Sequence, residues 1–143
     1  MKKAKSLFTF IFFAFSVLST PAVASCERFS FSELKALAEE AGFSTSLSST
    51  IAAVSLAESS GYSCAHNDNR NTYDDSYGLM QINMINYPHY KLGESRLKSF
   101  KLTSNKDLFD PLVNMKAAKK IYDTSGLNAW SVYRHGTYKK YLP

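Results

Sequence analysis

One acidic side chain stands where an apolar helix is expected to end. The segment from Thr50 to Gly61 is apolar or small up to Glu58, and Gly61 is a typical helix stop. A helix that is apolar on most faces is normally buried, so Glu58 should lie where a buried helix returns to the surface. Burial disfavours the charged carboxylate and raises its pKa. A carboxylic acid that keeps its proton near neutral pH can serve as a general acid, so Glu58 is the first candidate catalytic residue.

The elements expected around Glu58 are mainly helical. Ser30 to Glu33 fits a capping box, and apolar residues at helical spacing follow it up to Gly42, which predicts a first helix. The polar segment Ser44 to Ser49 is expected to be a short connection to the Glu58 helix. Residues 62–77 are rich in Asn, Asp, Ser and Tyr, which favours a polar loop or a small hairpin.

The second half of the chain is also expected to be mainly helical. The pattern of residues 78–83 does not distinguish helix from strand. Further helices are expected at Glu94 to Lys101, Asp110 to Gly126 and Ala129 to Tyr133. Asp110 and Pro111 are a typical N-cap and first helical residue, and Trp130 is expected in the core. Because no repeat or linker interrupts this pattern, the sequence predicts one small, mainly α-helical domain.

The N-terminus has the pattern of a secretory signal peptide. Lysines precede an apolar run from Leu7 to Leu18, and residues 19–24 end in small residues spaced for cleavage. The apolar run is short for a transmembrane helix, which disfavours an uncleaved anchor. We therefore expect residues 1–24 to be removed and residues 25–143 to form the mature domain, in the periplasm or outside the cell.

The net charge gives little support for a nucleic-acid partner. The chain has a formal charge of +5. The expected signal peptide contributes three lysines and no acid, which leaves +2 for the mature part. A mildly basic exported protein is compatible with an anionic partner such as the cell wall, but does not require one.

The chain has two cysteines, Cys26 and Cys64. In an exported protein an even number of cysteines predicts a disulfide, which here would join the mature N-terminus to the segment after Glu58. The segment Val23 to Cys26 also resembles a lipoprotein cleavage box, in which Cys26 would carry a lipid anchor. The spacer that contains Pro21 and the presence of a second cysteine favour the disulfide over the lipid.

Four short motifs follow one another along the chain. They are Ala57-Glu58-Ser59, Ser76-Tyr77-Gly78-Leu79-Met80-Gln81-Ile82-Asn83, Asp110-Pro111 with Asn114, and Val132-Tyr133-Arg134-His135-Gly136. They resemble the Glu-Ser pair, the Gly-Leu-Met-Gln motif, the Asp-Pro-x-x-Asn helix start and the Ala-Tyr-Asn-x-Gly motif of the lytic transglycosylase catalytic domain, in the lysozyme superfamily. The resemblance covers Thr50 to Tyr141. One such motif would be weak, but all of them in the right order are specific.

The resemblance implies a lysozyme-like fold, mainly α with some α+β character, and a substrate cleft. It implies cleavage of the β-1,4 bond between N-acetylmuramic acid and N-acetylglucosamine in peptidoglycan, with no cofactor. Glu58 would protonate the glycosidic oxygen and, as a carboxylate, would then accept the proton of the sugar's 6-hydroxyl. That hydroxyl attacks the anomeric carbon and leaves a 1,6-anhydro end.

A second carboxylate would change the predicted reaction, because ordinary glycosidases use two. In animal-type lysozymes, which the Tyr-Gly-x-x-Gln pattern also resembles, the second acid directly precedes the Tyr-Gly pair. This chain has Ser76 there, which favours the anhydro-forming reaction. A small loop shift could bring Asp74 or Asp75 to the cleft, and the chain would then be a lysozyme-type hydrolase. A solvated turn is the expected place for both aspartates.

The resemblance also implies which residues contact the sugars. These are Asn67, Ser76, Met80, Gln81 and Tyr133. Gln81 would bind a sugar amide or hold Glu58 in place, and the hydroxyl of Tyr133 would orient the acid. The alternatives are an amide satisfied by backbone for Gln81, core packing for Met80, and packing against Trp130 for Tyr133. Arg134 replaces the family's usual asparagine. We expect it to point outward or towards a substrate carboxylate, because a positive charge beside Glu58 would lower the pKa of the acid.

No metal site is expected, because His66, His89 and His135 lack the spacing of metal ligands. Three hypotheses follow: an anhydro-forming transglycosylase, a hydrolytic muramidase, and an accessory protein that binds the wall without cleaving it. The expected partner is a peptidoglycan strand. A small exported monomer also suits a secretion, pilus or conjugation apparatus, a phage-derived lysin or general wall turnover.

Overall fold

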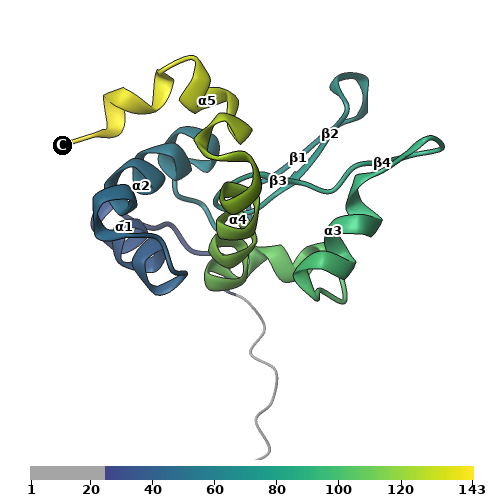
Figure 1. Cartoon of the computed structure of the whole chain (residues 1–143), viewed down its shortest axis with the longest axis horizontal. Helices are drawn as coiled ribbons and strands as arrows, with labels where there is room; N and C mark the ends of the chain where they lie inside the picture. Colours follow the sequence, from purple (N-terminus) through teal and green to yellow (C-terminus); the bar gives the residue numbers. More distant parts are fainter. Residues whose placement is uncertain (1–24) are drawn as a thin grey trace, which may run out of the picture.

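Helices make up most of the structure. The computed structural model describes residues 25–143, and the expected signal peptide at residues 1–24 lies outside the described residues. The α-helices are α1 (Phe31–Glu40), α2 (Thr45–Ser59), α3 (Leu92–Phe100), α4 (Pro111–Ser125) and α5 (Ser131–Arg134). Short 3-10 helices are η1 (Arg70–Thr72), η2 (Asn105–Phe109), η3 (Leu127–Ala129) and η4 (Thr137–Tyr141). The expected mainly helical fold is confirmed (Figure 1).

Two small antiparallel sheets lie beside the helices. The strands are β1 (His66–Asn69), β2 (Asp74–Tyr77), β3 (Ile82–Asn83), β4 (Asn86–Tyr87) and β5 (Tyr90–Lys91). One sheet has the order β1-β2-β3, and β4 pairs with β5 in a second hairpin. The polar segment 62–77 therefore forms a hairpin, and the ambiguous segment 78–83 is a turn that enters β3. Figure 1 shows α1 and α2 on one side, the hairpins on the other, and α4 between them.

The helix that carries Glu58 is longer than expected. α2 begins at Thr45, so the segment Ser44 to Ser49 is its N-cap and first turn and not a connection. Ser48 explains the difference. Its buried hydroxyl lies 2.9 Å from the carbonyl oxygen of Thr45 and 2.9 Å from Oε1 of Glu39. A short hydroxyl that bonds to the preceding turn is compatible with a helix, so a run of serines does not end one.

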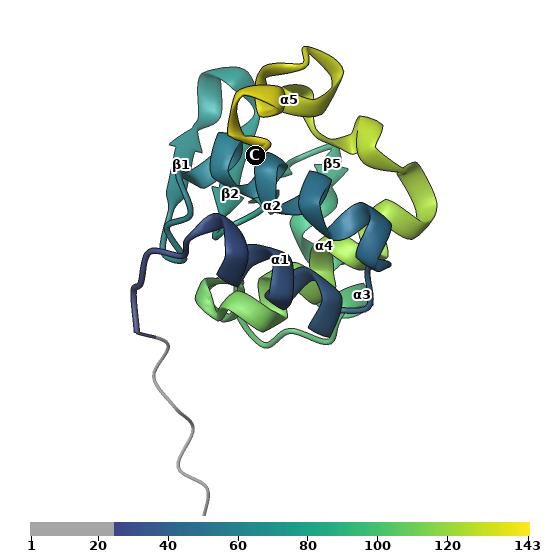
Figure 2. The ribbon, with the colours of Figure 1, turned by 90° about the vertical axis from the view of Figure 1, so that its left-hand side faces the viewer.

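The middle of α2 is in the core. Residues 51–55 are completely buried. The helix packs between α1 and the C-terminal η4, as Figure 2 shows. Glu58, one turn later, is only half-buried. The helix therefore leaves the core at its C-terminal end, as the sequence pattern predicts, and carries a carboxyl group to the surface.

A buried amide joins α4 to the turn before β3. Asn114 is fully buried, and its Nδ2 donates to the carbonyl oxygens of Tyr77 and Leu108, both at 2.8 Å. Its Oδ1 accepts the backbone N–H of Met80 at 2.9 Å. Gly78 has φ +73°, and a Cβ there would lie 2.2 Å from Nδ2 of Asn114. The turn thus accepts only glycine at this position while the amide stays in place.

The C-terminal segment returns to the same turn. The indole Nε1 of Trp130 donates to the carbonyl oxygen of Met80 at 2.9 Å, and Trp130 is 5% exposed. The prediction that Trp130 lies in the core is confirmed. The short helix α5 follows it directly, so residues 131–134 are held against the end of α2.

The N-terminal end of the described residues is attached to the loop that follows α2. Cys26 and Cys64 form a disulfide, as the sequence predicts. Beside it, the backbone N–H of Phe29 donates to the carbonyl oxygen of Gly61 at 2.8 Å. Within residues 25–143 no helix has the length and apolar character that crossing a membrane requires.

The replacement Asn114→Ala should lower the free energy of unfolding by about 2–5 kcal/mol, because it leaves three buried backbone groups unpaired and opens a cavity. Urea unfolding followed by circular dichroism measures this. Lys116→Ala, at an exposed position of the same helix, is the matched control and should change little. Equal stability of the two variants would show that the amide does not hold the turn.

Replacing both cysteines by serine should lower the free energy of unfolding by about 2–4 kcal/mol, because the unfolded chain then loses a constraint on a long loop. Thermal unfolding with and without a reductant measures it. The reduced wild-type protein should match the double variant. A reductant that leaves the wild-type melting temperature unchanged, or a lipid found on Cys26 by mass spectrometry, would contradict this prediction.

Candidate active site

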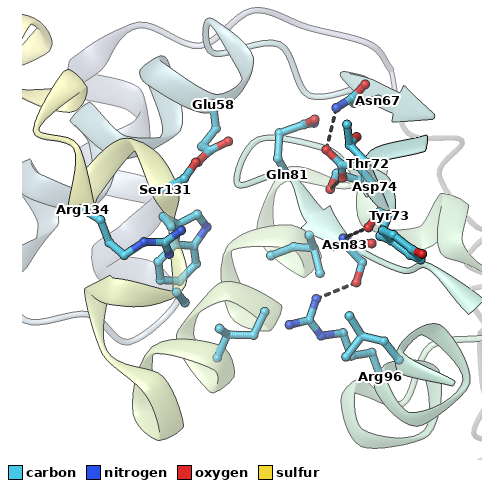
Figure 3. A pocket seen from close by; sticks show the side chains of 16 residues that line it. Glu58, Asn67, Thr72, Tyr73, Asp74, Gln81, Asn83, Arg96, Ser131 and Arg134 are labelled. Atoms are coloured by element: carbon cyan, nitrogen blue, oxygen red, sulfur yellow. Dashed lines mark hydrogen bonds between the residues drawn. The ribbon is translucent and has the colours of Figure 1, made fainter. Parts of the chain in front are cut away.

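A cleft of about 600 Å³ lies at the end of α2. Side chains from α2, the β1-β2-β3 sheet, α3, α4 and α5 line it. Figure 3 shows Glu58 and Arg134 on one side of the cleft, Asn67 and Asp74 on another, and Gln81 between the two groups. The cleft is thus built from segments that are far apart in the sequence.

The Glu58 carboxyl group is the candidate acid. Burial is the main cause that raises its pKa to about 7, and the negative charge of Asp74 adds to the shift. A hydrogen bond from the backbone N–H of Val132 and the positive charge of Arg134 act in the opposite direction with smaller effects. At neutral pH both forms of the carboxyl group are populated, so Glu58 can donate a proton and later accept one.

A row of polar side chains faces Glu58 from the sheet. In the strand register Asn67 is paired with Ser76, and Ser76 with Asn83, so all three lie on one face. Asp74, two residues before Ser76, shares this face. One oxygen of Asp74 accepts from Nδ2 of Asn67 at 2.6 Å, and the other accepts from the hydroxyl of Ser76. All four residues line the cleft.

The expectation of a solvated turn for both aspartates is wrong, because both lie on β2. Alternation along the strand separates them. Asp75 is on the opposite face from Asp74, and its Oδ1 lies 2.9 Å from Nε2 of His66. The ring of His66 in turn stacks on Tyr77, with the ring centres 4.3 Å apart. Of the two aspartates, only Asp74 lines the cleft.

Glu58, Asn67, Ser76 and Gln81 are the residues proposed from the sequence that line the cleft. The amide nitrogen of Gln81 donates to the carbonyl oxygens of Ala65 at 3.2 Å and Gly78 at 3.0 Å. The amide nitrogen of Gln81 is therefore hydrogen-bonded to the backbone, as one of the two interpretations of the sequence predicts. Its amide oxygen is the group that could bind a ligand.

Two residues proposed as sugar contacts do not line the cleft. Met80 is completely buried and fills the core, because its backbone is bound on both sides, by Asn114 and by Trp130. Tyr133 stacks on Tyr138, with ring centres 5.0 Å apart, and not on Trp130. It is the backbone of Val132 in this helix, and not the hydroxyl of Tyr133, that bonds to Glu58.

Sequence reasoning missed several cleft residues. Tyr73, at the tip of the β1-β2 hairpin, is 63% exposed and has φ +59°. Nδ2 of Asn83 donates to its carbonyl oxygen at 2.9 Å, and its ring lies 4.7 Å from that of Tyr87. Arg96 reaches the cleft from α3. Only the alternation of β2 and β3 could have indicated Asn83, and nothing in the sequence pattern indicates Tyr73 or Arg96.

Arg134 lies closer to the acid than expected. It lines the cleft, and its Nη1 donates to the carbonyl oxygen of Asn128 at 2.6 Å. Its charge lowers the pKa of Glu58, but this is the smallest of the four causes, so burial still decides the result. Within residues 25–143 no three His, Cys, Asp or Glu side chains are grouped as metal ligands would be.

The comparison with protein families identifies the family of this domain. The family described as "Lysozyme like domain" matches residues 35–132, which is more than half of the chain, and the chain belongs to that family. Neither a curated protein nor a solved structure matches the chain. Membership in the lysozyme-like family supports an enzyme that cleaves glycosidic bonds in peptidoglycan.

The charges around Glu58 predict opposite shifts of its pKa. Asp74→Asn removes a like charge and should lower the pKa of Glu58 below about 7. Arg134→Gln removes an opposite charge and should raise it. Because an acid must be protonated to act, activity should fall above about pH 7 in the wild type, at lower pH in Asp74→Asn and at higher pH in Arg134→Gln.

Carboxyl-carbon NMR of labelled Glu58 follows the same titration without turnover. Asp75→Asn is the control, because Asp75 faces the other side of β2. It should leave the midpoint nearly unchanged. Shifts of the same sign in Asp74→Asn and Arg134→Gln would show that these charges do not set the pKa of Glu58.

Proposed function

We propose that this protein is an exported peptidoglycan lytic transglycosylase, with Glu58 as its acid and its base. The observation that carries the proposal is a half-buried carboxyl group with a pKa of about 7 in a cleft large enough for sugars. A group that must give up a proton and take one back within a cycle works best when its pKa is close to the working pH.

The proposed reaction balances without water. Protonated Glu58 donates its proton to the glycosidic oxygen, and the bond from that oxygen to the anomeric carbon of N-acetylmuramic acid breaks. The 6-hydroxyl of the same sugar attacks the anomeric carbon. The Glu58 carboxylate accepts the proton of this hydroxyl and is ready for another cycle. The products are a free 4-hydroxyl on one chain and a 1,6-anhydro end on the other.

Asp74 fits an electrostatic role in this reaction. Asn67 and Ser76 each donate a hydrogen bond to one of its oxygens, which fixes the carboxylate on the wall of the cleft. A fixed negative charge on the cleft wall stabilises the positive charge that develops on the sugar. It also raises the pKa of Glu58, which increases the protonated fraction of the acid at neutral pH.

The second candidate function is a lysozyme-type muramidase. It is favoured by one observation, the presence of Asp74 in the same cleft as Glu58. In a hydrolase the second carboxylate acts as nucleophile or activates water. Ser76 stands where animal-type lysozymes have this acid, so Asp74 would have to act from two residues earlier on the strand. The third candidate, a wall-binding protein without activity, gives no reason for a protonated carboxyl group in the cleft.

The disulfide supports export and ordinary cleavage of a signal peptide. It uses the sulfur of Cys26 that a lipid anchor would need, and disulfides persist in oxidising compartments. We therefore propose a periplasmic or extracellular protein. Among the settings considered, local opening of the wall for a secretion, pilus or conjugation apparatus suits an enzyme of this size.

Mass spectrometry of the sugar products tests the proposed reaction. Purified residues 25–143 incubated with peptidoglycan should release anhydro-muramic ends, which are one water lighter than reducing ends. Reducing ends would establish the muramidase and contradict the transglycosylase. Asp74→Asn should then abolish product formation, whereas in a transglycosylase it should slow the reaction by about 10–100-fold and keep the anhydro product. Asp75→Asn is the control in both cases.

Glu58→Gln should abolish cleavage and leave the fold intact. The folded protein binds the Glu58 proton more tightly than the unfolded chain does, since its pKa rises from 4.5 to about 7. This stabilisation is complete below about pH 4.5 and is lost as the pH rises through about 7. Relative to the wild type, the variant should therefore be more stable at pH 8 than at pH 5. Full cleavage by Glu58→Gln would contradict every enzymatic role for this residue.

A further inference from the structure

Arg96 is a cation on the cleft wall without an acidic partner. It comes from α3 and lines the cleft, as do the apolar Leu92 and Ile121. The chain has twelve acidic residues, all of them in the part that the structure describes. No carboxylate oxygen of residues 25–143 lies within 4.0 Å of a nitrogen of Arg96. Its charge is therefore not neutralised inside the protein.

The guanidinium group of Arg96 makes few contacts with polar groups of the described residues. Its Nη1 donates to the carbonyl oxygen of Asn83 at 2.5 Å, which is the one hydrogen bond that it makes with the described residues. A guanidinium has several further N–H donors in a planar fork that matches a carboxylate. Burial lowers the pKa of Arg96 although the neighbouring Tyr90 acts in the opposite direction. A partly desolvated cation of this kind gains most from an anion that enters the cleft.

The other charged side chains of the cleft already interact with neighbouring residues. Arg134 lies beside Glu58 and lowers its pKa, whereas Arg96 is not among the causes of that shift. Asp74 is held by Asn67 and Ser76. Figure 3 shows Arg96 in a different part of the cleft, next to Asn83 and away from Glu58. The positive charge of Arg96 therefore lies in the cleft but apart from the Glu58 carboxyl group.

We propose that Arg96 forms an anion-binding subsite, which binds a carboxylate carried on the lactyl arm of N-acetylmuramic acid. This deepens the proposed function and rests on it. The carboxylate is either the free lactyl group of a sugar without peptide or a carboxylate of the stem peptide on that arm. N-acetylglucosamine has no carboxylate. Arg96 thus distinguishes peptidoglycan from chitin, whose backbone has the same β-1,4 linkage.

Isothermal titration calorimetry in the Glu58→Gln background measures binding without cleavage. The ligands are a chitin tetrasaccharide and three peptidoglycan tetrasaccharides. The peptidoglycan ligands have a free lactyl carboxylate, an amidated lactyl group, or the stem peptide. The protein with Arg96 should prefer a carboxylate-bearing ligand over the amidated one by about tenfold. Adding Arg96→Met should remove this preference and leave the Kd of both neutral ligands within about twofold.

Lys98→Met is the matched control. It removes one positive charge from an exposed position of the same helix and should keep the preference. The free lactyl and stem-peptide ligands distinguish the two sources of the carboxylate. Only the ligand whose carboxylate contacts Arg96 should bind more weakly to the Arg96→Met variant. Arg96→Lys should restore part of the preference, because it keeps the charge but not the planar fork.

Equal weakening of neutral and anionic ligands by Arg96→Met would assign Arg96 a structural role, through its bond to Asn83, and would overturn the proposal. An unchanged preference would overturn it as well. Failure of the proposed reaction is a separate result, namely no anhydro product from the wild type. A carboxylate preference that depends on Arg96 would then still support the subsite. Absence of binding to all four glycans would contradict both proposals.

Discussion

The site depends on the buried amide of Asn114. A buried polar group is costly unless it is hydrogen-bonded, and this one is bonded to backbone groups of Tyr77, Met80 and Leu108. These bonds fix the turn that starts at Gly78, which joins β2 to β3. The carbonyl oxygen of Met80, held in the same turn, accepts the indole N–H of Trp130. Helix α4, the sheet and the C-terminal segment therefore meet at one polar point inside the core.

The chemistry of Glu58 follows from where its helix ends. Burial has a larger effect on the pKa than any single neighbouring charge, so the position of α2 in the core determines that the group is an acid at neutral pH. Asp74 and Arg134 adjust the value in opposite directions. The cleft thus separates two tasks. Burial in the fold raises the pKa of Glu58, and the polar row on the sheet places the charge of Asp74 and several hydrogen-bonding groups on another wall of the cleft.

The sequence predicted the start of a helix correctly where a capping residue is present. The capping box at Ser30 and the Asp110 N-cap are both present in the structure. The predicted start of α2 was wrong, because a serine-rich sequence is typical of a linker even where a serine hydroxyl bonds to the backbone of its own helix. A small hairpin was one of two alternatives for residues 62–77, but β2 lacks the apolar alternation that would have located the strand, so the sequence did not show which aspartate faces the cleft. The sequence could not indicate Arg96, because what distinguishes it is its place in the cleft without a carboxylate within 4.0 Å among residues 25–143.

The bond between Trp130 and Met80 connects positions 50 residues apart. Contacts across such a distance form late in folding, because a long loop must close before they stabilise the chain. Val132 and Arg134 reach the end of α2 together with Trp130 and complete the wall beside Glu58. Both of these groups lower the pKa of Glu58, against the burial that raises it. The final pKa of Glu58 is therefore set late in folding, when the last segment of the chain docks and brings two groups that favour the ionised carboxylate.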